Sequence, residues 1–163
     1  MALELKAAYL AWLEPYRWDW FCTLTLRPRI GRESANRDFK NWISDLEKEG
    51  KSQLSWVRVA EFGRFGQRLH FHALIAGVRR VSADYAESLW KRMAGRAEIG
   101  EYDGTRNGIG YLLKPLETGP EIDLDADLSD RHLIERKINR RVQRPAPTDS
   151  RRGRRADVAR QNT

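Results

Sequence analysis

The sequence has almost no cysteine and no long apolar stretch. Its single cysteine, Cys22, cannot form a disulfide within the chain, so we expect a buried strand residue in a protein of a reducing compartment. No segment approaches the roughly 20 consecutive apolar residues that a membrane-spanning helix requires. Residues 1–6 do not join a basic region to an apolar run, so no secretory signal is expected. These absences favour a soluble cytoplasmic protein without a membrane partner.

Positive charge is in excess, but it is unevenly distributed along the 163 residues, whose formal net charge is +7. Residues 136–163 hold ten Lys and Arg against two Asp and Glu, a net charge of +8. Residues 117–135 carry a net charge of −6, and residues 1–116 carry +5. A basic domain with a basic tail favours a polyanionic partner, most simply nucleic acid, although a solubilising tail on an ordinary protein gives the same pattern.

The composition predicts one domain followed by two segments of different charge. Residues 1–116 are numerous enough to form a packed core. Residues 117–143 indicate an acidic linker that can hold a short helix near 128–138. Proline, glycine, serine and repeated arginines in residues 144–163 indicate a disordered basic tail. Such a tail would add DNA affinity that is independent of sequence and falls with salt.

Hydrophobic periodicity predicts alternating helices and strands within the domain. Apolar residues at helical spacing predict helices over 2–14, 34–49, 82–94 and 107–114. Alternating apolar and polar residues predict strands over 21–26, 56–62, 68–75 and 96–102. This order of elements favours an α+β fold in which helices pack on one face of an antiparallel sheet.

Histidine is also rare, and two of the three histidines, His70 and His72, stand in the expected strand 68–75. Side chains two residues apart in a strand share a face and lie roughly 7 Å from each other. The two imidazoles therefore point the same way, while Leu69 and Phe71 point into a core. Because the motif is short, a pair of solvent-facing histidines explains it equally well when it is taken alone.

A carboxylate is expected beside these histidines. A four-residue loop at 64–67 would pair strand 56–62 with the histidine strand so that Glu61 lies opposite His70. A loop one residue longer or shorter would break this register, so the pairing is a prediction. Two imidazoles and a carboxylate on a rigid hairpin suit a divalent metal that must also hold a substrate.

Several polar, basic and aromatic side chains are candidates for contacting a phosphate or a base. In strand 21–26, Thr23 and Thr25 share one face, although the β-propensity of threonine explains them as well. The loops that border the expected site carry the remaining candidates, which are Arg27, Arg29, Arg64, Phe65, Arg68 and Arg106.

The last expected helix offers a nucleophile, Tyr111, with Lys114 three residues later on the same helical face. A tyrosine hydroxyl has an ordinary pKa of about 10 and reacts slowly at neutral pH. A nearby ammonium group stabilises the phenolate or anchors the phosphate that it attacks. A tyrosine next to two leucines on a helix is also typical of core packing. Tyr102 and Tyr85 are alternative nucleophiles, but neither has a lysine three residues later.

Taken in order, these stretches resemble the motifs of HUH single-strand endonucleases, most closely those of the replication-initiator (Rep) branch. The His-Phe-His run at 70–72 resembles the His-hydrophobic-His motif, and residues 21–26 resemble the first motif, a strand with a Thr-Leu-Thr type run. Residues 110–114 resemble the Tyr-x-x-Lys motif that carries the nucleophile. Glu61, nine residues before the first histidine, stands where Rep proteins commonly carry the third metal ligand.

The resemblance implies an RRM-like or ferredoxin-like sheet of four or five antiparallel strands. On its open face Glu61, His70 and His72 would bind Mg²⁺ or Mn²⁺, with Tyr111 presented from a helix beside them. The implied activity is nicking and joining of single-stranded DNA at a rolling-circle origin. Tyr111 would stay linked to the 5′ phosphate and leave a 3′-OH for a host polymerase, while Lys114 stabilises charge. Many Rep proteins continue into a helicase domain, which 163 residues cannot hold, so a separate helicase is expected.

Other functions stay open at this stage. A single-tyrosine transposase or a mobilisation relaxase would use the same metal site. A non-catalytic nucleic-acid-binding module on the same fold would use the histidines and Tyr111 only structurally. A mononuclear iron oxygenase also uses two histidines and one carboxylate, but the charge pattern argues against it.

Overall fold

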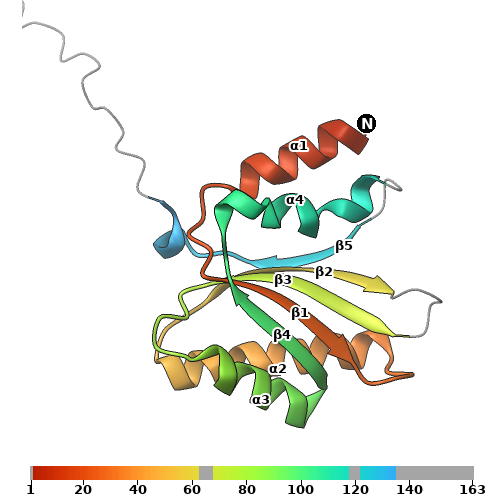
Figure 1. Ribbon diagram of the computed structural model, residues 1–163, viewed down its shortest axis with the longest axis vertical. Coiled ribbons are helices and arrows are strands. Elements are labelled where there is room, and N and C mark those ends of the chain that lie inside the picture. The colour runs from red at the N-terminus through yellow and green to blue at the C-terminus, as the bar shows by residue number, and fades with distance from the viewer. Residues whose placement is uncertain (1, 63–67, 118–121, 135–163) are drawn as a thin grey trace, which may run out of the picture.

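The structure, a computed structural model, describes residues 2–62, 68–117 and 122–134 of the chain. It is an α+β fold built on one five-stranded antiparallel sheet (Figure 1), as the sequence predicts. The helices are α1 (Ala2–Leu13), α2 (Arg32–Gly50), α3 (Ala83–Met93) and α4 (Gly108–Leu112). The strands are β1 (Trp20–Leu26), β2 (Ser55–Phe62), β3 (Leu69–Ala76), β4 (Gly95–Glu101) and β5 (Asp123–Asp127). Short 3₁₀ turns are η2 (Gly104–Arg106), η3 (Lys114–Glu117) and η4 (Asp130–His132).

The histidine strand β3 lies at the centre of the sheet, whose order is β4-β1-β3-β2-β5. One face of the sheet is apolar and is covered by α2 and α3 (Figure 1). Leu24 and Phe71 of the strands pack there against Phe39 and Trp42 of α2 and Trp90 of α3, and all five are fully buried. The expected layer of helices and the expected burial of Cys22 are therefore both present.

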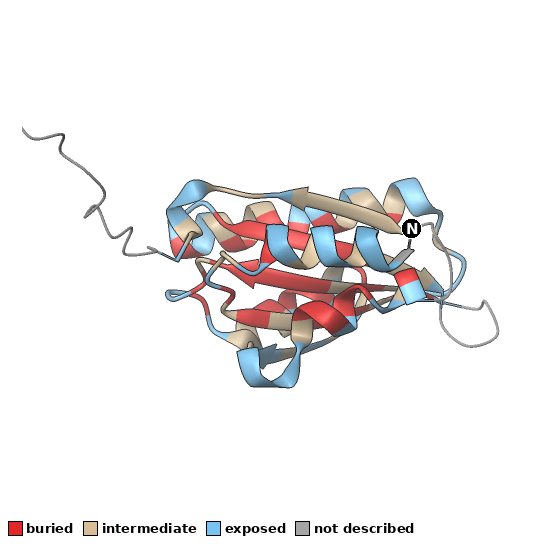
Figure 2. Cartoon of the chain, turned by 90° about the horizontal axis from the view of Figure 1, so that it is seen from above, coloured by how far each residue is buried: buried red, intermediate tan, exposed pale blue. Residues whose placement is uncertain are grey.

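Helices α1 and α4 add a partial cover on the opposite face (Figure 1). They pack with η3 over the apolar end of that face, where Val57 and Leu74 are buried against Leu13, Ile109 and other side chains. Figure 2 shows that buried residues gather in the strands and on the inner sides of the helices. The polar end of this face, with the two histidines, lies beyond the second cluster and is only partly covered.

The expectation that residues 117–143 form an acidic linker is wrong for the part that the structure describes. Residues 123–127 are strand β5, which pairs with β2 and completes the sheet. Its Asp-Leu-Asp-Ala-Asp sequence alternates, and Leu124 packs against the apolar cluster under α1 and α4. Its carboxylates meet basic side chains of neighbouring elements: Asp123 pairs with Arg32, and Asp125 lies 3.6 Å from Arg58. These pairs allow an acidic segment to serve as an edge strand.

His132, which we expected on the surface, is half buried and interacts with β2. Its Nδ1 lies 2.7 Å from the Ser55 hydroxyl. The short helix expected near 128–138 is the single 3₁₀ turn η4 in its described part. The predicted tail, 144–163, lies outside the described residues. None of the helices in the described residues is both long and apolar enough to span a membrane.

Candidate active site

The register of the central hairpin brings the predicted ligands to one face. Glu61 pairs with His70, and Val59 pairs with His72, as the four-residue loop predicts. On the other side of β3, Thr25 pairs with His70 and Thr23 with His72. Because side chains alternate along each strand, both threonines lie on the histidine face. Cys22, Leu24 and Leu26 point to the opposite, buried face.

Each histidine is oriented by one threonine. The Thr25 hydroxyl oxygen lies 3.0 Å from His70 Nδ1, and the Thr23 hydroxyl oxygen lies 3.3 Å from His72 Nδ1. A hydroxyl that accepts a hydrogen bond from Nδ1–H fixes the tautomer in which Nε2 carries the lone pair. Metal-binding histidines are typically held in this way by a partner on the second ring nitrogen. Both imidazoles can therefore offer Nε2 as a ligand.

Glu61 contacts His72 from the neighbouring strand. Its Oε2 lies 3.1 Å from His72 Nε2. Burial lowers the pKa of His72 below its ordinary value, and the positive charge that His70 takes on when protonated lowers it further, while Glu61 opposes both effects. The lowered pKa keeps His72 neutral at pH 7, which is the form that binds a metal.

The three side chains fit a divalent metal by their chemistry. Among the described residues, no three His, Cys, Asp or Glu side chains are already grouped closely enough to hold an ion. In the structure Glu61 contacts His72 Nε2 directly, so metal binding would exchange this contact for two contacts to the ion. Two imidazole nitrogens, each backed by a hydroxyl, and one carboxylate form a donor set suited to a divalent ion with open positions.

Tyr111 stands directly beside this group. Its ring lies edge-on to His72, with 5.4 Å between the ring centroids, and 5.7 Å from the ring of Phe21. The side chain is 52% exposed, whereas the neighbouring Leu112 and Leu113 are buried. The alternative interpretation of Tyr111 as a core residue is therefore wrong, because α4 turns its leucines inward and the phenol outward.

The position of Tyr111 depends on an unusual helix start. Asn107 has a φ of 52°, and its side-chain oxygen accepts a hydrogen bond from Gly110 N–H. Its backbone oxygen accepts from Tyr111 N–H at 3.0 Å. A Cβ on Gly110 would lie 2.3 Å from the Asn107 amide, so a larger residue would displace the cap. The sequence alone shows Asn-Gly-Ile-Gly, but not that this cap presents the tyrosine.

Lys114 lies near Tyr111 but not on the same helix, because α4 ends at Leu112 and Lys114 begins η3. Its Nζ is 5.9 Å from the centroid of the Tyr111 ring. Of the alternative nucleophiles, Tyr85 packs against the core under α2 and α3, on the other face of the sheet. Tyr102 is closer to the site, but burial, followed by the charges of Glu14 and Asp103, raises its pKa and disfavours the phenolate.

Comparison with known proteins places these residues in a family context. Residues 19–119 match the model of a family of replication-associated proteins, described as the ORF2 type, and this span includes β1 to η3 and all the predicted site residues. The chain belongs to this family. Membership indicates a role in replication and is consistent with a DNA partner.

Two further comparisons add little to this assignment. A comparison of this replication-associated protein with curated proteins gives no match. Among solved structures it is similar to the hypothetical protein ORF119 from Sulfolobus islandicus rod-shaped virus 1. The two chains are 15% identical with a TM-score of 0.47, and the match covers 79% of this chain and 100% of ORF119.

A cavity of about 790 Å³ opens next to Tyr111 in the replication-associated protein. Phe21, Thr23 and Tyr102 line it together with the edge strand β4. Arg106, one of the predicted DNA-contacting residues, also lines it and lies 3.3 Å from the Asp103 carboxylate through its Nε. The cavity has aromatic walls and reaches the nucleophile, so it is large enough to hold part of a nucleotide.

Three other predicted DNA-contacting residues meet at a second cavity. Arg27, Arg29 and Arg68 surround a hollow of about 610 Å³ at the end of β1 and of the β2-β3 hairpin. Phe62, which the sequence interpretation missed, lines the same hollow and is 59% exposed. The signal for it was the alternation of β2, which puts an apolar side chain at the hairpin end, beyond the buried part of the strand. The remaining candidates, Arg64 and Phe65, lie outside the described residues.

Proposed function

We propose that this replication-associated protein is a metal-dependent endonuclease that nicks and rejoins single-stranded DNA at a replication origin through Tyr111. The observation that carries the proposal is the contact between Tyr111 and His72. It puts an exposed phenol 5.4 Å, between ring centroids, from one of two oriented imidazoles. A structural tyrosine would not need exposure at this position, and a binding module would not need Nε2 atoms freed by hydroxyl partners.

The metal would be Mn²⁺ or Mg²⁺, held by Glu61, His70 and His72. When bound, such an ion withdraws charge from a phosphate oxygen and thereby makes the phosphorus more electrophilic. Thr23 and Thr25 position the imidazoles and so determine where that phosphate would lie. The open cavity beside Tyr111 then receives the nucleotide next to the scissile bond.

Tyr111 would perform the covalent step. Its oxygen attacks the phosphorus and forms a P–O bond, while the bond from phosphorus to the 3′ oxygen breaks. The electron pair of that bond goes to the 3′ oxygen, which takes a proton and becomes a free 3′-OH. The Lys114 ammonium stabilises negative charge on the phenolate or on the phosphate. Because one phosphodiester replaces another, attack by an incoming 3′-OH reverses the step without water or a nucleotide cofactor.

A covalent-adduct assay tests this proposal. The protein is mixed with single-stranded oligonucleotides that tile the DNA flanking its own gene, with Mn²⁺ or with EDTA, and is run on a denaturing gel. We expect a slower protein band that requires Mn²⁺ and disappears in Tyr111→Phe. Tyr102→Phe is the matched control, because it removes a hydroxyl from the same cavity and should keep the band.

Three outcomes would change the assignment. A band that survives Tyr111→Phe and disappears in Tyr102→Phe would move the nucleophile. A band on transposon ends or transfer origins in place of replication origins would favour a transposase or relaxase. If no oligonucleotide gives a band and binding is the same in EDTA, the protein is a nucleic-acid-binding module.

A further inference from the structure

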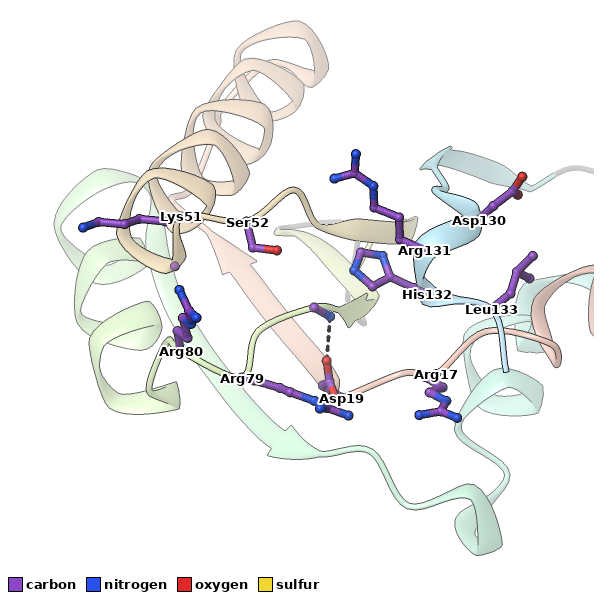
Figure 3. A pocket seen from close by; sticks show the side chains of 12 residues that line it. Arg17, Asp19, Lys51, Ser52, Arg79, Arg80, Asp130, Arg131, His132 and Leu133 are labelled. Atoms are coloured by element: carbon purple, nitrogen blue, oxygen red, sulfur yellow. Dashed lines mark hydrogen bonds between the residues drawn. The ribbon is translucent and has the colours of Figure 1, made fainter. Parts of the chain in front are cut away.

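A third cavity lies at the opposite end of the sheet from the histidine pair. It has a volume of about 830 Å³ and opens where β3 ends and where β1 and β2 begin (Figure 3). Its walls come from the segment before β1, the end of α2, the β3-α3 loop and η4. None of the residues that line it belongs to the site around Tyr111.

The lining of this cavity is strongly basic. Five cationic side chains surround it: Arg17, Lys51, Arg79, Arg80 and Arg131. Two acidic residues, Asp19 and Asp130, leave a net charge of +3 when His132 is neutral. Within the described residues, none of the five cations forms an ion pair or a side-chain hydrogen bond. Their charge is therefore available to a ligand.

One of the two acidic residues is already engaged by the backbone. The Asp19 Oδ2 accepts hydrogen bonds from Gly77 N–H at 2.6 Å and from Val78 N–H at 3.2 Å, and the first of these is drawn in Figure 3. These bonds hold the start of the β3-α3 loop, which carries Arg79 and Arg80, against the start of β1. The carboxylate thus serves the loop and does not neutralise the arginines by direct contact.

The remaining wall is held just as closely. Gly77 has a φ of +96°, and a Cβ there would lie 2.6 Å from His132 Nε2, so its backbone packs directly on the imidazole. His132 is bound through Nδ1 to Ser55, and its backbone oxygen accepts from Arg17 N–H at 2.7 Å. The cavity is therefore lined by cations on a connected and rigid backbone frame.

Such a frame suits phosphate groups in a row. Guanidinium groups bind phosphates through paired hydrogen bonds, and several unpaired arginines around one hollow favour a polyanion over a single anion. His70 and Gly77 are seven positions apart along β3 and its end, a distance of about 23 Å. Successive phosphates of one DNA strand are about 3.4 Å apart along a duplex axis, so this distance corresponds to about seven nucleotides.

We propose that the basic cavity binds backbone phosphates of the DNA about seven nucleotides from the position that Tyr111 reaches. The spacing to the nick rests on the function proposed above, whereas the phosphate binding itself does not. The cavity would then hold the segment that flanks the cleaved strand and fix its register on the protein without reading bases.

A binding assay in EDTA tests the cavity without involving cleavage. The probes are a fluorescein-labelled DNA hairpin with a single-stranded arm of about ten nucleotides, and the arm alone. Fluorescence anisotropy gives their affinities over a range of salt concentrations. The test variant is Arg79→Ala/Arg80→Ala. The matched control is Arg37→Ala/Arg92→Ala, which removes two exposed arginines that line none of the cavities described here.

We expect the test variant to bind the hairpin about tenfold more weakly and to lower the slope of log affinity against log salt by about 1.8, for two lost phosphate contacts. Arg79→Lys/Arg80→Lys should restore most of the slope. Loss on the hairpin alone would identify a duplex flank as the source of the phosphates, and equal loss on the arm would identify the single strand. A test variant that behaves like the control on both probes would overturn the proposal. Tyr111→Phe should bind like the wild type, so a failure of the nuclease proposal would not affect this result.

Discussion

The ring of Tyr111 stands at 89° to the imidazole of His72, with 5.4 Å between the ring centroids. This contact joins two segments that are 39 positions apart in the sequence, α4 and the central strand. It makes the position of the nucleophile sensitive to changes in either element. The consequences can be tested one residue at a time.

Thr25→Val should impair activity through His70. The substitution keeps the shape of the side chain but removes the hydroxyl that lies 3.0 Å from His70 Nδ1. Loss of such a partner typically costs 10–100-fold in metal affinity or activity, and we expect about tenfold in both. Mn²⁺ affinity is measured by titration calorimetry, and nicking is measured on a gel. Thr25→Ser should stay near the wild type, and a Thr25→Val protein with unchanged Mn²⁺ affinity would show that the hydroxyl has no such role.

Gly110→Ala should displace Tyr111 without unfolding the domain. The new Cβ would collide with the Asn107 amide that caps α4, and loss of a cap costs about 1 kcal/mol of stability. We expect nicking to fall at least tenfold, because a small misplacement of a reacting group is costly. Gly100→Ala is the control, since a Cβ there meets nothing within 4 Å. Equal nicking rates for the two variants would contradict the importance of the cap.

Phe62→Ala should weaken binding of single-stranded DNA. The exposed ring lies beside Arg27, Arg29 and Arg68, where it can stack on a base. Stacking on an aromatic side chain is worth about 1–3 kcal/mol per base, so we expect affinity to fall about tenfold. Trp12→Ala removes another exposed aromatic, one that lies on α1 away from this cavity, and should have little effect. Phe62→Trp should retain affinity, and a Phe62→Ala protein that binds normally would exclude stacking at this position.

His132 should make the free energy of unfolding depend on pH in the acid range. Burial lowers its pKa in the folded state, Arg131 lowers it further, and Asp19 opposes these effects. The unfolded protein therefore binds more protons below the ordinary value of about 6.5, so stability is full at pH 7 and falls as the pH drops through that value. Urea unfolding at pH 7 and pH 5 measures the change. His132→Gln should lose less stability than the wild type over this interval, and His72 contributes equally to both. An identical loss in the two proteins would contradict the prediction.

The sequence was sufficient to predict the hairpin and its polar face. Alternation identifies β2 and β3, and the length of the loop between them determines that Glu61 faces His70. Alternation in β1 likewise places Thr23 and Thr25 on that face, where each contacts one histidine. These relations depend on local geometry with a period of two residues, which a sequence displays directly.

The rest depends on contacts between distant segments. The strand β5 was hidden because three aspartates in five residues resemble a solvated linker, and its partners Arg32 and Arg58 lie far away in the sequence. The exposure of Tyr111 follows from the cap at Asn107, which no periodicity reveals. The basic cavity combines residues from four separate segments, so its charge is visible only after folding.

The most direct test of the proposed nucleophile is to identify the modified tyrosine by mass spectrometry. After cleavage in Mn²⁺, the covalent adduct is digested with nuclease and trypsin, leaving a nucleotide on one peptide. Trypsin should release Tyr85, Tyr102 and Tyr111 in different peptides, because Arg or Lys residues separate them. The expected peptide spans residues 107–131, since the Lys114-Pro115 bond resists trypsin, and it holds Tyr111 as its single tyrosine. A nucleotide on this peptide would support the mechanism, and a nucleotide on the peptide of Tyr102 or Tyr85 would contradict it.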